Sequence, residues 1–209
     1  MSGSLDLAAA RGWVDAFLDA ADRERTELGE LDRRSGDGDF GTNLLTSIRR
    51  ARTDLEAATP GVPGDVFGTL SRAFLQTGGT SGPLYGMWFR EFQQACGQRA
   101  EIGLLEVAAA VANGLATVQR LGKAEPGDKT MVDAMAPASE ALAVAVRDGV
   151  GLAEGLASAA RAARIGAEAT GELLARRGRA SYVGEVARGV IDPGAVAVAL
   201  FFESAVTSA

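Results

Sequence analysis

Three aspartates stand close together in the first quarter of the chain. Asp32, Asp37 and Asp39 fall within one short segment, and a single glycine separates the last two. Carboxylates crowded into one cleft repel one another unless a cation neutralises them. Magnesium suits such a cluster, because it prefers carboxylate, phosphate and water oxygens as ligands. The spacing predicts a metal site, and the alternative is a solvated turn whose aspartates cap the next helix.

The rest of the composition limits which metal ions and which catalytic groups the chain can use. The chain has no histidine and a single cysteine, Cys96. It therefore lacks a Ser-His-Asp triad and a histidine-ligated zinc, and it cannot carry a phosphohistidine. An EF-hand is excluded because, counting from Asp37, the sixth and twelfth residues are Thr42 and Ile48, where that loop needs glycine and glutamate. Oxygen ligands favour magnesium, calcium or manganese.

Glycine-rich motifs precede four of the expected helices. They are Gly36-Asp37-Gly38-Asp39-Phe40-Gly41, Gly78-Gly79-Thr80-Ser81-Gly82-Pro83, Gly127-Asp128-Lys129-Thr130 and Asp192-Pro193-Gly194. Helix N-termini attract phosphate, because they present unpaired backbone N–H groups and a partial positive charge. The chain contains neither a P-loop nor a Rossmann motif. Each motif alone is also consistent with an ordinary helix cap, for example one beside a surface lysine at Lys129.

The elements that must position these motifs are helical. Apolar residues recur at helical spacing in eight segments, and no segment shows a convincing strand period. The first covers 4–28, the seventh 152–175, and the eighth begins at Asp192 with Pro193 behind it. Short connections favour antiparallel neighbours, so the second, fourth, sixth and eighth helices should all begin at one end. We expect an all-α, single-domain, up-and-down fold over 1–209, with the four motifs at that end.

The remaining connections divide into two kinds. Those at 58–64, 97–103 and 148–151 contain turn residues but no comparable chemistry, so we expect the opposite end to be scaffold. The polar segment 176–191 is much longer, and polar connections of that length in compact domains are usually functional.

Composition restricts location and partners. Hydrophobic residues make up 47% and aromatic residues 6%, which suits closely packed helices. The formal charge of −6 argues against nucleic acid or an acidic membrane as the main partner. The longest apolar run, 195–202, is far shorter than a bilayer span, and the N-terminus lacks a signal-peptide pattern. With its lone cysteine, the sequence predicts a cytoplasmic protein that binds neither nucleic acid nor membrane.

Taken in order, the motifs resemble those of the L subunit of dihydroxyacetone kinase over nearly the whole chain. Besides the aspartate segment 31–43, the resemblance rests on the runs 79–86, 127–134, 178–185 and 192–194. It implies an eight-helix barrel with a nucleotide, ADP or ATP, at its mouth, where Asp32, Asp37 and Asp39 hold a pair of magnesium ions. The resemblance also implies a set of nucleotide-lining residues, namely Phe40, Gly41, Thr42, Asn43, Thr80, Ser81, Gly122, Met131, Arg179, Asp192, Pro193 and Gly194.

One position departs from the family pattern, since many members have histidine where this chain has Phe40. Any polar role of that side chain is lost here, while contact through its backbone or by stacking stays open. The nucleotide domain of fatty-acid kinases shares an Asp-Gly-Asp loop, but it lacks the run Gly82-Pro83-Leu84-Tyr85-Gly86. The resemblance to the L subunit is therefore the closer of the two.

The resemblance also implies partners. A separate K subunit would hold dihydroxyacetone, and this chain would supply the phosphoryl group. Its donor is either exchanging ATP or a tightly held ADP that a phosphotransferase-system M subunit rephosphorylates, and a free-standing L chain favours the second. Three alternatives stay open: an ATP-exchanging kinase subunit for another small ketose, a nucleotide-sensing regulator without catalysis, and a structural bundle that binds no nucleotide. The oligomeric state, including a homodimer, is also open.

Overall fold

The structure, a computed structural model, describes residues 3–177, 179–182 and 187–207, with the backbone only at 179 and 180. These residues form eight α-helices: α1 (Leu7–Ser35), α2 (Phe40–Ala57), α3 (Pro63–Leu75), α4 (Ser81–Cys96), α5 (Leu104–Gly122), α6 (Val132–Arg147), α7 (Leu152–Ala169) and α8 (Pro193–Thr207). Two 3₁₀ helices, η1 (Thr170–Glu172) and η2 (Arg179–Tyr182), lie between α7 and α8. The predicted all-α fold is confirmed.

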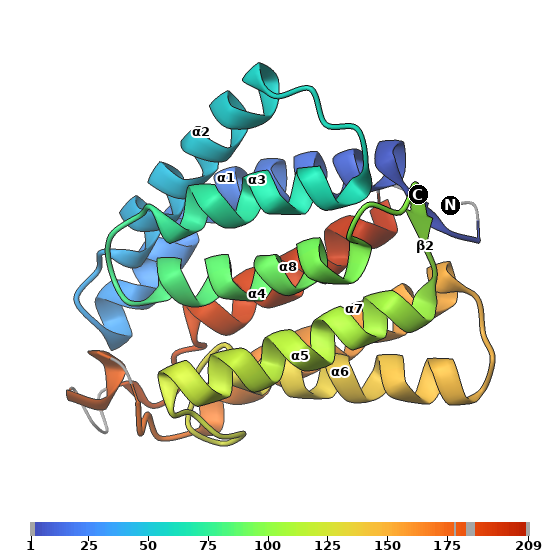
Figure 1. Cartoon of the computed structure of the whole chain (residues 1–209). Helices are drawn as coiled ribbons and strands as arrows, with labels where there is room; N and C mark the ends of the chain where they lie inside the picture. Colours follow the sequence, from blue (N-terminus) through green and yellow to red (C-terminus); the bar gives the residue numbers. More distant parts are fainter. Residues whose placement is uncertain (1–2, 178, 183–186, 208–209) are drawn as a thin grey trace.

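Consecutive helices pack side by side in antiparallel order, and α8 closes the bundle against α1 (Figure 1). The helices α2, α4, α6 and α8 all begin at the left of this view, here called the mouth end. The opposite end, called the scaffold end, holds the connections 58–64, 97–103 and 148–151, whose residues suggest no binding or catalytic role. The predicted up-and-down topology is thus confirmed.

A short antiparallel sheet at the scaffold end differs from the prediction. Strands β1 (Leu5–Asp6) and β2 (Glu101–Ile102) pair Leu5 with Ile102 and Asp6 with Glu101. Strands of two residues are too short to produce a period in the sequence. The pairing ties the start of α1 to the connection between α4 and α5, and Asp6 also caps α1 by accepting a hydrogen bond from the N–H of Ala9 (2.8 Å).

An aromatic cluster anchors α8 in the core. The ring of Phe201 on α8 lies 4.6 Å from that of Trp13 on α1 and 5.0 Å from that of Trp88 on α4, measured between centroids. The indole N–H of Trp13 donates to the backbone carbonyl of Phe201 (2.7 Å). Because α8 is buried on almost every side, these contacts fix its axis and thereby the position of its first turn at the mouth.

At the mouth end, two helices end at residues other than those that the sequence predicts. Helix α1 was expected to end at 28 but continues to Ser35, so Asp32 lies in its last turn rather than in a loop. Helix α7 was expected to reach 175 but ends at Ala169 and gives way to η1. Residues 29–35 are mostly polar, so the sequence does not show that α1 continues, whereas Leu173, Leu174 and Ala175 extend the apolar pattern beyond the end of α7.

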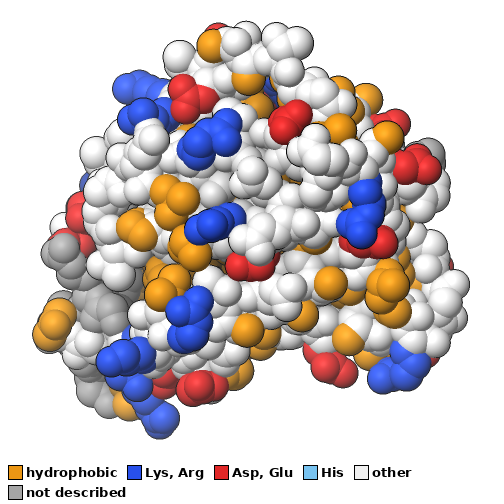
Figure 2. Space-filling model, viewed as in Figure 1, with side chains coloured by type: hydrophobic (Ala, Val, Ile, Leu, Met, Phe, Trp, Pro, Cys, Tyr) orange, Lys and Arg blue, Asp and Glu red, His pale blue; other side chains and the backbone are white. Residues whose placement is uncertain are grey.

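The outer surface carries charges of both signs (Figure 2). Charged side chains of both signs are scattered over the face shown in Figure 2, with small apolar areas between them. No helix among the described residues combines the length and hydrophobicity that a bilayer crossing requires.

Candidate functional site

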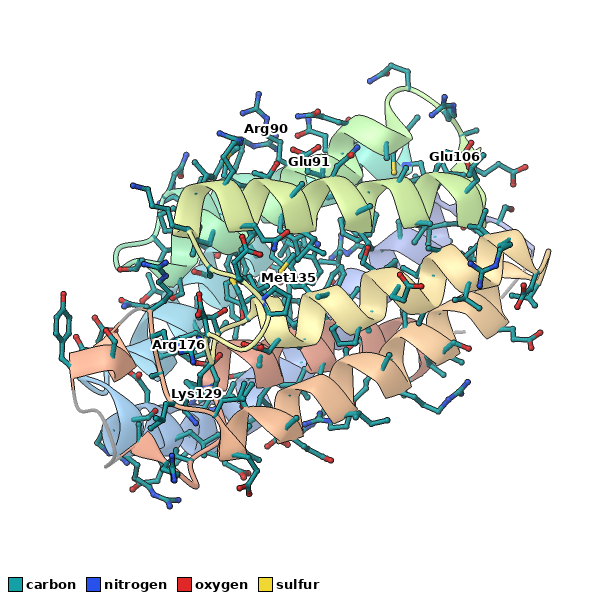
Figure 3. The ribbon with its side chains drawn as sticks, turned by 90° about the horizontal axis from the view of Figure 1, so that it is seen from below. Arg90, Glu91, Glu106, Lys129, Met135 and Arg176 are labelled. Atoms are coloured by element: carbon teal, nitrogen blue, oxygen red, sulfur yellow. The ribbon has the colours of Figure 1, made fainter. Side chains whose placement is uncertain are left out.

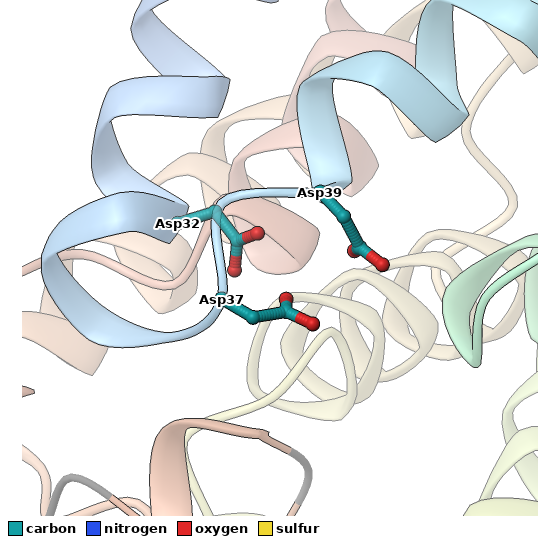
Figure 4. A group of neighbouring side chains, drawn as sticks. All are labelled: Asp32, Asp37 and Asp39. Atoms are coloured by element: carbon teal, nitrogen blue, oxygen red, sulfur yellow. The ribbon is translucent and has the colours of Figure 1, made fainter.

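The three aspartates predicted from the sequence converge at the mouth end. Asp32 projects from the last turn of α1, and Asp37 and Asp39 lie in the connection to α2. One carboxylate oxygen from each side chain lies within 4.8 Å of the other two, and Figure 4 shows the three groups facing a common space. This all-oxygen set fits a hard divalent cation.

Local hydrogen bonds explain how the connection between α1 and α2 folds. The Asp32 carboxylate accepts from the backbone N–H of Phe40 (2.9 Å), and the Asp32 carbonyl accepts from that of Gly36 (2.5 Å). Gly38 turns the chain with φ of 81°, a conformation that side chains disfavour. Asp32 thus joins the end of α1 to the start of α2 and fixes the loop that carries the other two aspartates.

The electrostatics of this cluster favour a bound cation. Partial burial raises the pKa of the Asp32 carboxyl, and the charges of Asp37 and Asp39 raise it further, while the Phe40 N–H opposes the rise. In the metal-free protein, ionisation of Asp32 is therefore less favourable than that of an isolated carboxyl group. A divalent cation would reverse this, because opposite charge within a few ångströms stabilises the ionised form.

The aspartates form one wall of an open cleft with an empty volume of about 790 Å³. Its lining joins residues from the starts of all four even-numbered helices, as the topology predicted. Of the residues predicted to contact nucleotide, those that line the cleft are Phe40, Thr80, Ser81, Met131, Asp192, Pro193 and Gly194. The cleft therefore brings together, at one end, segments that are up to 160 residues apart in the sequence (32 to 192).

Four other predicted residues do not line this cleft, and the side chain of a fifth lies outside the described residues. Asn43 lies in a small adjoining pocket, which Phe40 and Ser81 also line, and Thr42 is exposed on α2. Gly41 packs against α1, where an added Cβ would stand 2.8 Å from the Arg25 carbonyl oxygen. The last two are Gly122, which packs beside cleft-lining Leu84, and Arg179, whose side chain lies outside the described residues.

The cleft also contains residues absent from the predicted set, namely Ser35, Leu84, Tyr85, Lys129, Thr130 and Arg177. Tyr85 is almost fully buried, and its hydroxyl donates to the carbonyl of Gly194 (2.6 Å). Four of them lie inside the glycine-rich runs 79–86 and 127–134, so these runs indicate the right segments: Leu84, Tyr85, Lys129 and Thr130. Spacing alone does not indicate which members of a motif face inward.

Lys129 is buried, which corrects the suggestion of a surface lysine. Its relative exposure is 1%, and its ammonium group donates to the carbonyl oxygens of Thr170 (2.5 Å) and Val190 (2.6 Å). Burial lowers the pKa of this lysine, while the negative charges of Asp192, Asp133 and Glu172 oppose that change. The positive charge is retained inside the protein because two carbonyl dipoles and nearby carboxylates surround it.

Asp192 lies at the start of α8 and caps it. Its carboxylate accepts from the N–H of Ala195 (2.7 Å), and its own N–H donates to the Thr170 hydroxyl (2.8 Å). Burial raises the pKa of the Asp192 carboxyl to about 7; Asp133 and Asp32 add to the rise, while the Ala195 N–H and Lys129 oppose it. The nucleotide-free protein thus holds a carboxyl group that resists ionisation at the base of the cleft.

This raised pKa makes stability depend on pH. Between pH of about 4 and 7 the unfolded chain ionises Asp192 while the folded chain keeps it neutral, so stability falls as pH rises through that window. Asp192→Asn removes this loss and keeps a good helix cap. In thermal melts of nucleotide-free, metal-free protein, the variant should melt at least about 3 °C above the unmodified chain at pH 8, with a smaller difference at pH 5.

Asp148→Asn at the scaffold end is the matched control for that experiment, since Asp148 is exposed beside Arg147. It should shift the melting temperature equally little at both pH values. A difference for Asp192→Asn that does not change between pH 5 and pH 8 would show that the Asp192 carboxyl titrates normally.

Comparison with known proteins places the chain in a family. A family model described as the DAK2 domain matches residues 34–207, which include two of the three aspartates and all four even-numbered helices. The chain belongs to the DAK2 domain family. The predicted resemblance to the L subunit of dihydroxyacetone kinase is thereby confirmed at the level of the family.

Two curated relatives differ in how much of their own length this chain covers. The chain is 34% identical to the ADP-binding subunit DhaL of the PEP-dependent dihydroxyacetone kinase of Escherichia coli, over 93% of both chains. It is 37% identical to the triokinase/FMN cyclase of Rattus norvegicus over 85% of its own length, but it spans only 31% of that protein. The domain therefore matches one relative almost entirely and the other as a part of a longer chain.

A solved structure is similar to the whole fold. The dihydroxyacetone kinase of C. freundii, in complex with AMP-PNP and Mg²⁺, matches with a TM-score of 0.69 and 26% identity. The match covers 97% of this chain and 34% of that one. A protein with this helical arrangement has thus been solved with a nucleotide analogue and magnesium.

Proposed function

We propose that this chain is the nucleotide-binding subunit of a kinase for a small ketose, with dihydroxyacetone as the expected substrate. The observation that carries the proposal is the cleft itself. It combines a three-carboxylate cluster with the starts of four helices, and no other pocket in the described part of the chain has that combination. Phosphoryl transfer requires mainly positioning and charge neutralisation, which are the two properties that such a cleft supplies.

The carboxylates would hold magnesium. Asp32, Asp37 and Asp39 offer oxygen ligands within reach of one another, and bound magnesium would neutralise charge on the phosphate groups. The resemblance implies two ions. The structural relative supports magnesium and an adenine nucleotide as a pair, because it was solved with both AMP-PNP and Mg²⁺.

The nucleotide would lie across the helix starts. Thr80 and Ser81 stand where α4 begins and can present backbone N–H and hydroxyl donors to phosphate or ribose. Asp192 to Gly194 stand where α8 begins, where the Gly194 N–H would be the donor, because Pro193 has no N–H and that of Asp192 donates to the Thr170 hydroxyl. Phe40 is nearly buried and its N–H is used by Asp32, so its contribution would be apolar contact.

The ketose would be held by a separate K subunit. We further propose that the nucleotide stays bound as ADP and is rephosphorylated by a phosphotransferase-system M subunit, as the PEP-dependent name of the E. coli relative supports. Exchange of free ATP, for this ketose or another, is the alternative. A purely regulatory nucleotide sensor is less favoured, because the carboxylate cluster needed for magnesium is intact.

Substitutions at the two ends of the bundle test where the nucleotide binds. Thr80→Val and Ser81→Ala each remove a hydroxyl from the mouth, and each should weaken Mg-ADP binding about tenfold to a hundredfold, as expected for a lost hydrogen bond to a charged group. Calorimetric titration with ADP at fixed magnesium measures the change.

Matched changes at the scaffold end serve as controls. Arg99→Gln and Asp148→Asn alter exposed polar residues in the connections at that end, and affinity should stay within about twofold. If these controls weakened binding as much as the mouth variants in folded protein, the site would not be at the mouth. Unchanged binding in both mouth variants would place the phosphate groups elsewhere in the cleft.

A further inference from the structure

Lys129 has three properties that no part of the proposed chemistry uses. Its side chain is almost completely buried, it lines the base of the cleft, and its backbone has φ of 63°. Buried lysines are rare unless they are paired, and positive φ is uncommon for residues other than glycine. Such a conformation persists only where surrounding contacts impose it, and it is often found at functional sites.

The loop around Lys129 supplies those contacts. The Asp133 carboxylate accepts from the N–H groups of Gly127 (2.5 Å) and Thr130 (2.7 Å), and the Asp128 carboxylate accepts from that of Glu125 (3.0 Å). These bonds curl the loop before α6 and direct the Lys129 side chain inward. In Figure 3 Lys129 lies at the mouth end with Arg176, opposite Glu106 near the start of α5.

The ammonium group reaches two segments that are distant in sequence. It donates to the carbonyl of Thr170, just after α7, and to the carbonyl of Val190, two residues before Asp192. The Thr170 hydroxyl in turn accepts from the N–H of Asp192 (2.8 Å). Lys129 and Thr170 therefore form one connected network that holds the backbone immediately before α8.

The other side of the α8 start is held independently. Tyr85 from α4 donates to the carbonyl of Gly194, while Asp192 caps the first turn through the N–H of Ala195. The segment from Asp192 to Gly194 is thus fixed between Tyr85 and the Lys129 network. Charge-assisted hydrogen bonds are the stronger kind, so the ammonium group is the main contributor on its side.

We propose that Lys129 is a positioning residue for the nucleotide site, whose ammonium holds the start of α8 in the conformation that receives the nucleotide. The inference rests on the proposed function, because it assigns Asp192 to Gly194 to nucleotide contact. Lys129 itself acts by holding that segment in place and does not contact the nucleotide. Its loss should speed release of nucleotide without altering magnesium binding by the aspartates, which belong to α1 and its connection to α2 and, among the described residues, make no hydrogen bond to Lys129.

The test uses Lys129→Met, which keeps the apolar stem and removes the charge. Release of a fluorescent ADP analogue from the full chain, chased with excess ADP at fixed magnesium, should become about tenfold to a hundredfold faster. Thr170→Val removes the hydroxyl that accepts from Asp192 and should act in the same direction. In the double variant the acceleration of release should be smaller than the product of the two single accelerations, since both residues belong to one network.

Leu156→Ala provides the control for general destabilisation, because it opens a cavity in α7 on the scaffold side of the core. Equal acceleration of release by this variant, at a comparable loss of melting temperature, would overturn the inference. Additive effects in the Lys129 and Thr170 pair would overturn it as well.

Hydrogen exchange keeps the inference testable if the proposed function fails. Without nucleotide, Lys129→Met should speed exchange at the amides of Asp192 and Ala195, whose hydrogen bonds hold the α8 start. Failure of the unmodified chain to bind any nucleotide would count against the proposed function alone. Unchanged exchange at both amides would show that Lys129 does not hold this segment.

Discussion

Asp37→Asn should remove magnesium-dependent nucleotide binding almost completely while leaving the helices intact. Asp37 supplies one of three carboxylate oxygens that lie within 4.8 Å of one another, and an amide is a much weaker ligand for a hard cation. Changes next to a metal ligand typically reduce metal affinity 10- to 100-fold, so loss of a ligand should cost more than about a hundredfold. Calorimetry with ADP at matched magnesium measures this, and Asp39→Asn should behave alike.

The same substitution should not destabilise the empty protein. Asp37 and Asp39 both raise the pKa of Asp32, so removing one charge relieves repulsion in the metal-free state. The melting temperature in EDTA should therefore stay the same or rise, and helicity by circular dichroism should not change. Asp148→Asn is the matched control at the scaffold end. Unaltered affinity for nucleotide in Asp37→Asn would exclude the cluster as the metal site.

The second large effect concerns catalysis: the chain alone should bind nucleotide yet fail to phosphorylate free dihydroxyacetone. It has no histidine to act as a general base, and its clustered aspartates are assigned to magnesium. A positioned base contributes about a hundredfold to ten-thousandfold. A short sugar also makes few contacts with an open cleft, and correct orientation contributes several further powers of ten.

A coupled assay measures this requirement for a partner. The purified chain with ATP, magnesium and dihydroxyacetone should give at least about a thousandfold less turnover than the same mixture with a K subunit. Addition of PEP and the phosphotransferase components then distinguishes the donors. Turnover with K and ATP alone would show exchange of free ATP, and efficient turnover by the single chain would refute the partner requirement.

Much of the site followed from residue types combined with topology. The aspartate cluster was visible because three carboxylates and two glycines in eight positions, 32–39, restrict what the segment can do. The meeting of the four helix starts followed from antiparallel order alone, which places alternate helix starts at the same end. Neither inference needed side-chain detail, and the structure confirms both placements.

Two features that the sequence does not reveal, the burial of Lys129 and the partner of Tyr85, depend on long-range contacts, while a third, the position of Asp32, depends on local ones. Lys129 looked like a surface charge because nothing local indicates that it reaches carbonyl groups 41 and 61 residues away. Tyr85 fits a helical pattern, but its partner carbonyl is 109 residues distant. Asp32 was expected in a loop because the end of α1 is polar, and its helical position depends on hydrogen bonds from Gly36 and Phe40.

The magnesium dependence of ADP binding by the unmodified chain shows whether the mouth is a magnesium–nucleotide site. Calorimetric titration is carried out on protein stripped of nucleotide, once with magnesium and once with EDTA. We expect one ADP per chain with magnesium and binding weaker by more than about a hundredfold in EDTA, because the carboxylates then repel the phosphates. Absence of ADP binding with magnesium, or equal affinity in EDTA, would contradict a magnesium–nucleotide site at the mouth.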